Sequence, residues 1–303
     1  MKLSPSVGVI NLQTYSRPHL LSKCLSAIYS MEHSMEYDKI VVLQVGNKKV
    51  EELVYEFADN RTQILEVDGR NRTPLQNMNF NRWMALENAF SSPKRKWVFS
   101  IEEDVEVSRE SLIFIDQVYR TYSTNRKFRG INLGSILSDP ELIDTYSLQR
   151  FGVHGCGSVL TRKTWSIVKW SGVRSTLNKY PLDSAIEGIA KNGFMVTPNI
   201  TMYLDNGWDS GTHNQSSGNE PHYVMNRESW KLRTSTFTEY FREYTTPIPW
   251  RYDCVLFEPK DNFKYLLKSW LWQFNHFAIF RALFNSLRQI LKVIKTILNR
   301  IGF

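Results

Sequence analysis

The sequence predicts an α/β fold built on a doubly wound sheet. Short β-rich apolar runs alternate with amphipathic segments of helical length over the first 122 residues, and this spacing is typical of strands joined by helices. A chain of 303 residues with 42% hydrophobic and 22% charged residues can also bury a full core. We therefore expect one large domain with an appendage.

The first half of the chain supplies regular strand–helix pairs. Val7–Leu12 is a β-rich run, after which Ser16 and Pro18 mark the start of a helix that extends to about Tyr29. The elements expected after it are a strand Lys39–Val45, a helix Lys49–Asp59, a strand Gln63–Val67, a helix Asn77–Phe90, a strand Trp97–Ile101 and a helix Arg109–Tyr122. This order predicts a parallel sheet.

The pattern changes after residue 122, where the sheet is expected to become mixed. The elements predicted there are strands Ile131–Ile136 and Gly152–Leu160, helices Lys163–Trp170 and Asp183–Lys191, and a late strand Met195–Leu204. A loop rich in Gly, Ser, Asn and His, Asn206–Asn219, then ends all periodicity.

Three consecutive carboxylates, Glu102-Glu103-Asp104, follow the predicted strand Trp97–Ile101. Adjacent carboxylates repel one another, and burying them without a cation is costly. Oxygen ligands at the carboxyl edge of an open α/β sheet favour Mg²⁺ or Mn²⁺, which commonly carry a substrate diphosphate. The alternative is a solvated acidic turn that caps the next helix, since Val107–Glu110 also has the pattern of a helix start.

The net charge of +8 is concentrated at the end of the chain. Residues 263–303 contain seven Lys and Arg and no Asp or Glu, which leaves 31 basic and 30 acidic residues in the rest. From Leu283 onward, apolar residues at steps of three and four predict an amphipathic helix with a cationic face, a pattern that suits an anionic membrane surface. The alternative is a helix packed on the body or in a homo-oligomer. A nucleic-acid partner is disfavoured because the charge is mixed with an apolar stripe.

The three cysteines lie far apart, without a CxxC motif, so we expect reduced thiols and a cytosolic protein. The β-rich run begins within a few residues of Met1, which leaves no room for a signal peptide. No stretch approaches the ~18 apolar residues of a transmembrane helix.

Four segments in order resemble a known family: Arg17-Pro18-His19-Leu20-Leu21, Asn81-Arg82-Trp83-Met84-Ala85-Leu86, Glu102–Val107, and Gly155-Cys156-Gly157-Ser158 before a Trp-containing helix. Together they resemble nucleotide-sugar glycosyltransferases of the GT-A fold, most closely the N-acetylglucosaminyltransferase I type, over residues 7–214. The loop Asn206–His213 also resembles one in bacterial polysaccharide glycosyltransferases. Two departures stand out: Glu103 replaces the usual Asp, and Met84 is an extra residue.

The resemblance implies a nucleotide-sugar site at the carboxyl edge of the sheet. Asp104 is the expected metal ligand, and Glu103 is expected to face the ribose or a metal-bound water. The guanidinium fork of Arg17 suits a phosphate or a uracil carbonyl, although a surface arginine beside a proline turn is the simpler reading. Arg82 is expected to approach the donor, or else to form a solvated helix face. Weaker donor-side candidates are Thr14 and Tyr15.

An inverting mechanism also needs a carboxylate that removes the acceptor proton. Asp183 is the candidate, with Glu187 in reserve, and the alternative is an acid that only caps its helix. His213 in the polar loop is expected to contact the metal or a phosphate. Gly155 and Gly157 would allow close approach to the sugar or acceptor, unless they form a plain β-bulge.

The sequence thus predicts an inverting glycosyltransferase, dependent on Mn²⁺ or Mg²⁺. Its donor is expected to be a nucleotide-diphosphate sugar, UDP-linked. Its acceptor is expected to be a glycan or lipid-linked chain in polysaccharide assembly on the cytoplasmic face of the plasma membrane. A GT-A domain is expected over residues 1–245 and a basic, membrane-associating helical region over residues 246–303. One rival is a nucleotidyltransferase acting on a sugar phosphate. Such an enzyme would be supported by a Gly-rich phosphate loop after the first strand, and residues Asn11–Pro18 contain none. The other is a non-catalytic glycan- or membrane-binding module, disfavoured by Asp104 and Asp183.

Overall fold

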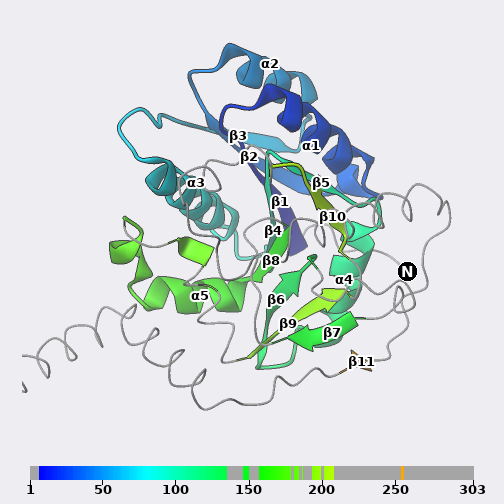
Figure 1. The fold of residues 1–303 in the computed structure, drawn as a ribbon. Coiled ribbons are helices and arrows are strands. Elements are labelled where there is room, and N and C mark those ends of the chain that lie inside the picture. Colours follow the sequence, from blue (N-terminus) through cyan, green and yellow to red (C-terminus); the bar gives the residue numbers. More distant parts are fainter. Residues whose placement is uncertain are drawn as a thin grey trace, which may run out of the picture.

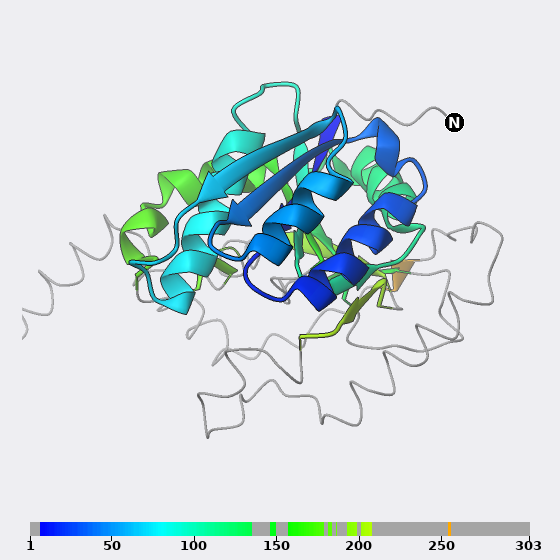
Figure 2. The same ribbon diagram turned by 90° about the horizontal axis from the view of Figure 1, so that it is seen from above.

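The computed structural model describes residues 7–134, 146–149, 157–178, 181–183, 186, 193–198, 201–207 and 254–255. Over these residues it has a sheet of nine strands in the order β11-β7-β9-β6-β8-β4-β1-β2-β3, and a separate ribbon of β10 and β5. Helices lie on both faces of the sheet (Figure 1 and Figure 2). This architecture confirms the predicted α/β class.

The first half of the sheet is parallel, as the alternation of strands and helices predicts. β1 (Gly8–Gln13) pairs in parallel with β2 (Asp38–Gln44) on one side and β4 (Trp97–Glu102) on the other, and β2 pairs with β3 (Thr62–Val67). The helices that join these strands are α1 (Pro18–Ser30), α2 (Lys48–Phe57) and α3 (Pro74–Ala89). The strand order reverses between β1 and β4, and open α/β sheets bind ligands in the crevice outside such a switch point.

The second half of the sheet is mixed. β8 (Ser158–Thr161) runs antiparallel to both β4 and β6 (Phe128–Asn132), and β9 (Phe194–Pro198) runs parallel to β6. β7 (Tyr146–Gln149), which the sequence does not predict, pairs antiparallel with β9 and parallel with β11 (Cys254–Val255). The helices of this half are α4 (Ser111–Tyr122) and α5 (Arg162–Trp170), with a short 3₁₀ helix η4 (Val173–Thr176). The 3₁₀ helix η2 (Ser34–Glu36) lies earlier, between α1 and β2.

The predicted late strand Met195–Leu204 is wrong as one element. β9 ends at Pro198, and β10 (Tyr203–Asp205) leaves the sheet to pair antiparallel with β5 (Val105–Val107). Proline has no N–H to donate, so it is a common place for a strand to leave a sheet. The ribbon brings residue 205 opposite residue 105, directly beside the acidic run.

Two apolar cores hold the layers together. On one face of the sheet, side chains of α1, α2 and α4 pack against Ile10 and Leu12 of β1. On the other face, α3 and α5 pack against Val9 of β1, and Trp83 meets Trp165 with ring centroids 4.6 Å apart. The two helix layers follow from the period-2 alternation of the strands, which presents an apolar side chain to each face in turn.

The α3 face of the sheet becomes polar toward the carboxyl ends of β1 and β4. Asn132, Ser158, Ser100 and Asn11 are buried and stand in register across β6, β8, β4 and β1. Because side chains alternate along a strand, Glu102 lies on this same face, two residues beyond Ser100. An apolar core does not need a row of buried polar side chains. The row therefore indicates that the functional site lies on this face of the sheet.

The predicted basic region over residues 246–303 lies outside the described residues, apart from the two residues of β11. Among the helices of the described ranges, none is both long and apolar enough to cross a bilayer.

Candidate active site

Glu103 is fully buried and ties the end of β4 to the loop between β1 and α1. Its carboxylate accepts hydrogen bonds from the backbone N–H of Tyr15 at 2.6 Å and of Ser16 at 3.3 Å, and from Arg17 Nε at 2.8 Å. Both carboxylate oxygens therefore hold the chain itself, and Glu103 shapes the loop. Its expected contact with a ribose or a metal-bound water stays a prediction.

Arg17 joins the two acids that follow Glu102. Besides its bond to Glu103, its Nη2 donates to Asp104 Oδ2 at 2.8 Å. Burial alone would lower the pKa of Arg17, but the neighbouring Asp104 and Glu103 outweigh burial and raise it. The two acids occupy Nε and Nη2 and fix the orientation of the guanidinium beside the crevice, and its remaining N–H donors are the ones that could reach a phosphate.

Asp205 is an acidic residue of the site that sequence reasoning missed. The β5–β10 ribbon brings it to Asp104, and the backbone N–H of Asn206 donates to the Asp104 carbonyl at 2.8 Å. Gly207 packs so closely that a Cβ there would lie 1.9 Å from Asp104 Oδ2, so only glycine fits. Burial and the charge of Asp104 raise the pKa of Asp205 to about 6.

Glu102 is the third acid of the cluster. Burial, the charge of Asp104 and that of Asp183 raise its pKa to about 8, against a smaller lowering by Arg82. The raised pKa values of Glu102 and Asp205 share one cause besides burial, which is the negative charge of Asp104. The cluster thus carries more negative charge than the nearby arginines neutralise, and it favours a bound proton or cation.

We expect Glu102→Gln to stabilise the protein in a pH-dependent way. A carboxyl with a folded pKa of about 8 and an unfolded pKa of about 4.3 binds its proton more tightly when folded, so its contribution is lost as pH rises through that window. The melting temperature of the variant should equal that of the wild type at about pH 4 and below and exceed it by about 2–4 °C or more at pH 9. A constant difference across this pH range, measured by thermal unfolding without divalent metal, would contradict this reading.

Asp183 and Arg82 form an ion pair between the start of a helical segment and α3. Arg82 is buried and also donates from Nη2 to Ser158 Oγ at 3.0 Å, whereas the Asp183 side chain is 20% exposed. The segment is held by Asn79, whose Nδ2 donates to the Leu177 carbonyl and whose Oδ1 accepts from Leu182 N–H at 2.8 Å. These contacts fix an accessible carboxylate on the polar face of the sheet.

The two donor-side candidates of the loop differ in their surroundings. Thr14 is buried, and both its N–H and its hydroxyl donate to the Val42 carbonyl, so its contacts are with β2. Tyr15 donates from its hydroxyl to Gln13 Oε1 at 3.2 Å. Burial and the charges of Glu102 and Glu103 raise its pKa well above the ordinary value, so the phenol remains protonated beside the acids.

Among the other predicted residues, only Gly157 lies in the described part of the chain; Gly155, Glu187 and His213 lie outside it. Gly157 has φ +69°, and a Cβ there would lie 2.5 Å from the Tyr203 ring. Both its backbone and its packing against β10 therefore require glycine.

The acidic residues fit a divalent cation of the Mg²⁺ or Mn²⁺ type. No group of three or more Asp, Glu, His and Cys side chains in the described ranges forms a ready metal site. Mg²⁺ is, however, commonly held by one or two carboxylates together with substrate phosphates. Asp104 and Asp205, which the β5–β10 ribbon brings together at the crevice, can supply carboxylate oxygens to that donor set, and Asp104 is also bonded to Arg17.

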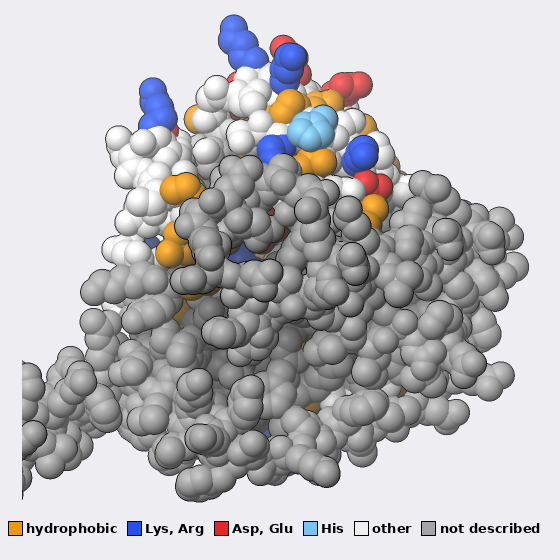
Figure 3. Space-filling model, in the orientation of Figure 1, with side chains coloured by type: hydrophobic (Ala, Val, Ile, Leu, Met, Phe, Trp, Pro, Cys, Tyr) orange, Lys and Arg blue, Asp and Glu red, His pale blue; other side chains and the backbone are white. Residues whose placement is uncertain are grey.

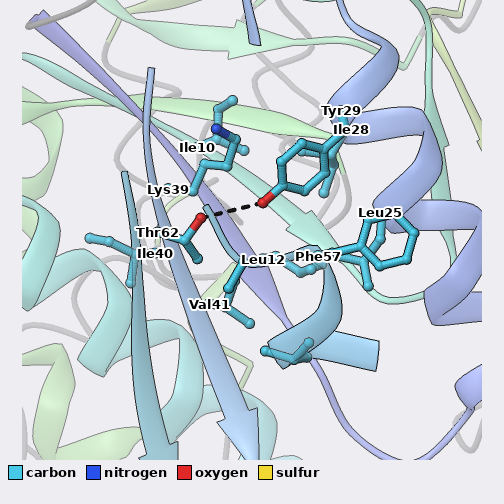
Figure 4. A pocket seen from close by; sticks show the side chains of 12 residues that line it. Ile10, Leu12, Leu25, Ile28, Tyr29, Lys39, Ile40, Val41, Phe57 and Thr62 are labelled. Atoms are coloured by element: carbon cyan, nitrogen blue, oxygen red, sulfur yellow. Dashed lines mark hydrogen bonds between the residues drawn. The ribbon is translucent and has the colours of Figure 1, made fainter. Parts of the chain in front are cut away.

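A small cavity between the sheet and helices α1 and α2 is not an alternative ligand site. It lies between β1, β2, α1 and α2, and Figure 4 shows its mostly apolar lining, with the Tyr29–Thr62 hydrogen bond of 3.3 Å. Its cavity volume of about 10 Å³ holds one water at most. No nucleotide fits there.

No protein-family model matches the sequence, and no curated protein matches it. Among solved structures, the chain is similar to the mannosyltransferase PcManGT from Pyrobaculum calidifontis in complex with GDP-Man and Mn²⁺, at 14% identity and a TM-score of 0.47, over 98% of this chain and 82% of that one. It is also similar to S. aureus TarS 1–349, at 8% identity and a TM-score of 0.50, over 89% of this chain and 81% of that one. At such identities the likeness to TarS shows a shared fold and nothing finer.

Proposed function

We propose that the protein is an inverting, metal-dependent glycosyltransferase that moves a sugar from a nucleotide-diphosphate donor, UDP-linked, to a glycan or lipid-linked acceptor. One observation carries the proposal: Asp104, Asp205 and Arg17 meet at the switch point of the sheet, beside the exposed carboxylate of Asp183. The segments that resemble nucleotide-sugar glycosyltransferases contain Arg17, Arg82 and Asp104, and they support the same reading.

The acidic side of the site would receive the diphosphate. Asp104 and Asp205 would hold a divalent ion, which when bound would supply electrostatic stabilisation of the charge on the departing diphosphate. Arg17, fixed against Asp104, would contribute a second positive charge. Glu103 keeps the loop that carries Arg17 in place through two backbone N–H groups.

Asp183 would act on the acceptor. As the acceptor oxygen bonds to the anomeric carbon, its proton passes to the Asp183 carboxylate, and the electron pair of the breaking bond leaves with the diphosphate. Arg82, itself bonded to Ser158, holds this carboxylate, whose exposed side would face the acceptor. The polar row across β6, β8, β4 and β1 adds buried hydroxyl and amide groups to the same face of the sheet.

We expect the Asp104→Asn variant to lose the metal-dependent part of donor binding. In the wild type, UDP-sugars with Mn²⁺ should raise the melting temperature by several degrees, because a ligand that binds only the folded state stabilises it. The variant should show no further rise when Mn²⁺ is added to the nucleotide sugar. A panel of UDP-, GDP- and CDP-sugars with and without Mn²⁺, read by differential scanning fluorimetry, tests both statements.

A Glu66→Gln variant controls for the loss of one acidic charge, because Glu66 lies in β3 outside the acidic cluster and accepts a hydrogen bond from the Tyr55 hydroxyl. Its metal-dependent shift should equal that of the wild type. If no nucleotide sugar shifts the wild type with Mn²⁺, the glycosyltransferase proposal fails. If Asp104→Asn keeps the full shift, the metal assignment fails alone.

We also propose that residues 246–303 hold the enzyme on an anionic membrane at its cytoplasmic face, next to a lipid-linked acceptor. The support is the cationic, acid-free composition of residues 263–303 and their apolar stripe. Each Lys or Arg near such a surface contributes about 1 kcal/mol, so the seven together are sufficient.

A further inference from the structure

A second pocket lies at the opposite end of β4 from the acidic site. It has a volume of about 290 Å³ and is lined by residues from the end of α4, the starts of β4 and β6, and the start of α5; they are Lys96, Tyr119, Ser123, Phe128, Thr161, Arg162 and Lys163. β4 spans six residues between Lys96 and the acids, a distance of about 20 Å at 3.3 Å per residue. The pocket is therefore separate from the crevice.

The chain segments around this pocket carry an excess of basic residues. Three stretches of chain meet there, residues 91–101, 123–134 and 157–171, and together they contain nine Lys and Arg and no Asp or Glu. Two of the nine pair with carboxylates of other elements, Arg95 with Asp38 and Lys169 with Glu87. By contrast, basic and acidic side chains are interspersed on the described surface near α1 and α2 (Figure 3). A single-sign field over a concave surface attracts an anion.

One arginine builds the pocket wall and is not available to a ligand. Arg162 donates from Nε to the Arg95 carbonyl and from Nη1 to the Phe90 carbonyl, both at 2.8 Å, and from Nη2 to the Ser92 carbonyl. Its own N–H donates to the Lys96 carbonyl at 2.7 Å. These bonds fix the loop before β4 against α5. They therefore also fix the backbone of Lys96 at the edge of the pocket.

The two lysines of the pocket, in contrast, keep donors for a ligand. Lys96 Nζ donates to the Pro93 carbonyl at 3.0 Å and Lys163 Nζ to the Arg126 carbonyl, and within the described residues no carboxylate pairs with either. Burial and the charges of Arg129 and Arg126 lower the pKa of Lys163, which reflects uncompensated positive charge. An ammonium group has three donors, so each lysine retains two.

We propose that this pocket binds a phosphate group, with Lys96 and Lys163 as the charged ligands and the hydroxyl of Ser123 at its wall. The Thr161 hydroxyl donates to the Arg129 carbonyl at 3.1 Å and therefore belongs to the wall only. Two cations from separate segments, together with a hydroxyl donor, match an anion with several oxygens. The rings of Tyr119 and Phe128 close one side, which leaves room for the phosphate and a small attached group. The phosphate could belong to a soluble ester or to a phospholipid headgroup. The proposal does not depend on glycosyl transfer.

The test compares a Lys96→Gln/Lys163→Gln variant with a matched Lys23→Gln/Lys49→Gln control, which removes the same charge from exposed positions of α1 and α2. Melting temperatures are measured with inorganic phosphate at constant ionic strength, in EDTA so that divalent metal does not contribute. At about 20 mM phosphate we expect a rise of about 2–4 °C for the wild type and the control, and none for the pocket variant.

A second arm separates the two sources of phosphate. Sedimentation with phosphatidylcholine vesicles that contain about 30% phosphatidylglycerol compares the same two variants, whose identical tails contribute equally. A deficit of the pocket variant in this arm assigns a lipid headgroup, and a deficit only with inorganic phosphate assigns a soluble ester. If the pocket variant matches the control in both arms, the proposal is overturned. Unchanged melting temperatures without ligand verify that both variants fold.

Discussion

Replacing Asp183 with Asn should lower kcat by about 10²–10⁴-fold while the affinity for the donor stays within about twofold. The amide keeps the size of the side chain, but it cannot take the proton of the attacking hydroxyl. Donor binding should survive because the cation that would bind the diphosphate is assigned to Asp104, in the turn after β4, and to Asp205 of β10, which lie outside the segment of Asp183. Initial rates at saturating donor, together with the donor-induced thermal shift, separate the two effects.

The substitution also affects stability, and the experiment must account for it. Arg82 is 3% exposed, and removing its anionic partner leaves a buried cation, a change that typically costs about 3–5 kcal/mol. Activity is therefore measured well below the melting temperature of the variant. Glu87→Gln is the control, because it removes an acid from α3, the helix that carries Arg82. The partner of Glu87, Lys169, is 48% exposed, so little should change. Full turnover in Asp183→Asn would remove the base assignment.

The parallel half of the fold is predictable from sequence because each of its elements has a local signal. β1, β2 and β4 are apolar runs buried on both faces, and α1 and α2 show a 3.6-residue period, whereas the signal of α3 is its start, the capping box of Thr73 and Gln76 with Pro74 between them. β5 and β10 have three residues each, too short for any period to register. They exist because they pair with each other across a long stretch of chain, which no local pattern encodes.

The site residues, like the strands, are predictable only where a local sequence pattern marks them. The run Glu102–Asp104 is visible in the sequence because it ends a strand, and Arg17 because it opens the helix after β1. The different roles of the acids are not visible in the sequence, because they depend on which carboxylate oxygens accept hydrogen bonds from the loop. Both oxygens of Glu103 accept such bonds, whereas Asp104 accepts one bond from Arg17. The Arg82–Asp183 pair likewise joins two predicted residues whose contact only the packing of α3 creates.

Asp205 offers the sharpest test of the acidic cluster, and we expect Asp205→Asn to separate stability from function. Its carboxyl has a pKa of about 6, raised by burial and by Asp104, against about 3.9 in the unfolded chain. The charged form is therefore disfavoured in the fold, and stability falls as pH rises from about 4 to about 6. Asn removes this charge, and its Oδ1 can still accept the Gly207 N–H bond of 2.8 Å.

Without metal at pH 8, the Asp205→Asn variant should therefore melt about 2–4 °C or more above the wild type, and the difference should vanish near pH 4. With Mn²⁺ and donor the order should reverse, because the wild type gains stability from the bound cation and the variant loses one of its two carboxylate ligands. Turnover should fall about 10²–10³-fold, as expected when several kcal/mol of charge stabilisation on the leaving diphosphate is lost.

The reversal distinguishes a metal ligand from a residue that only packs. A structural acid whose removal relieves repulsion would raise the melting temperature equally with and without Mn²⁺, and turnover would be unchanged. Asp205→Glu is the companion variant, since it keeps the charge but moves the carboxylate by one methylene away from its position beside Asp104. It should lose turnover without the metal-free gain in stability. If both variants respond to Mn²⁺ as the wild type does, the cation does not depend on the β5–β10 ribbon, and Asp104 must hold it without Asp205.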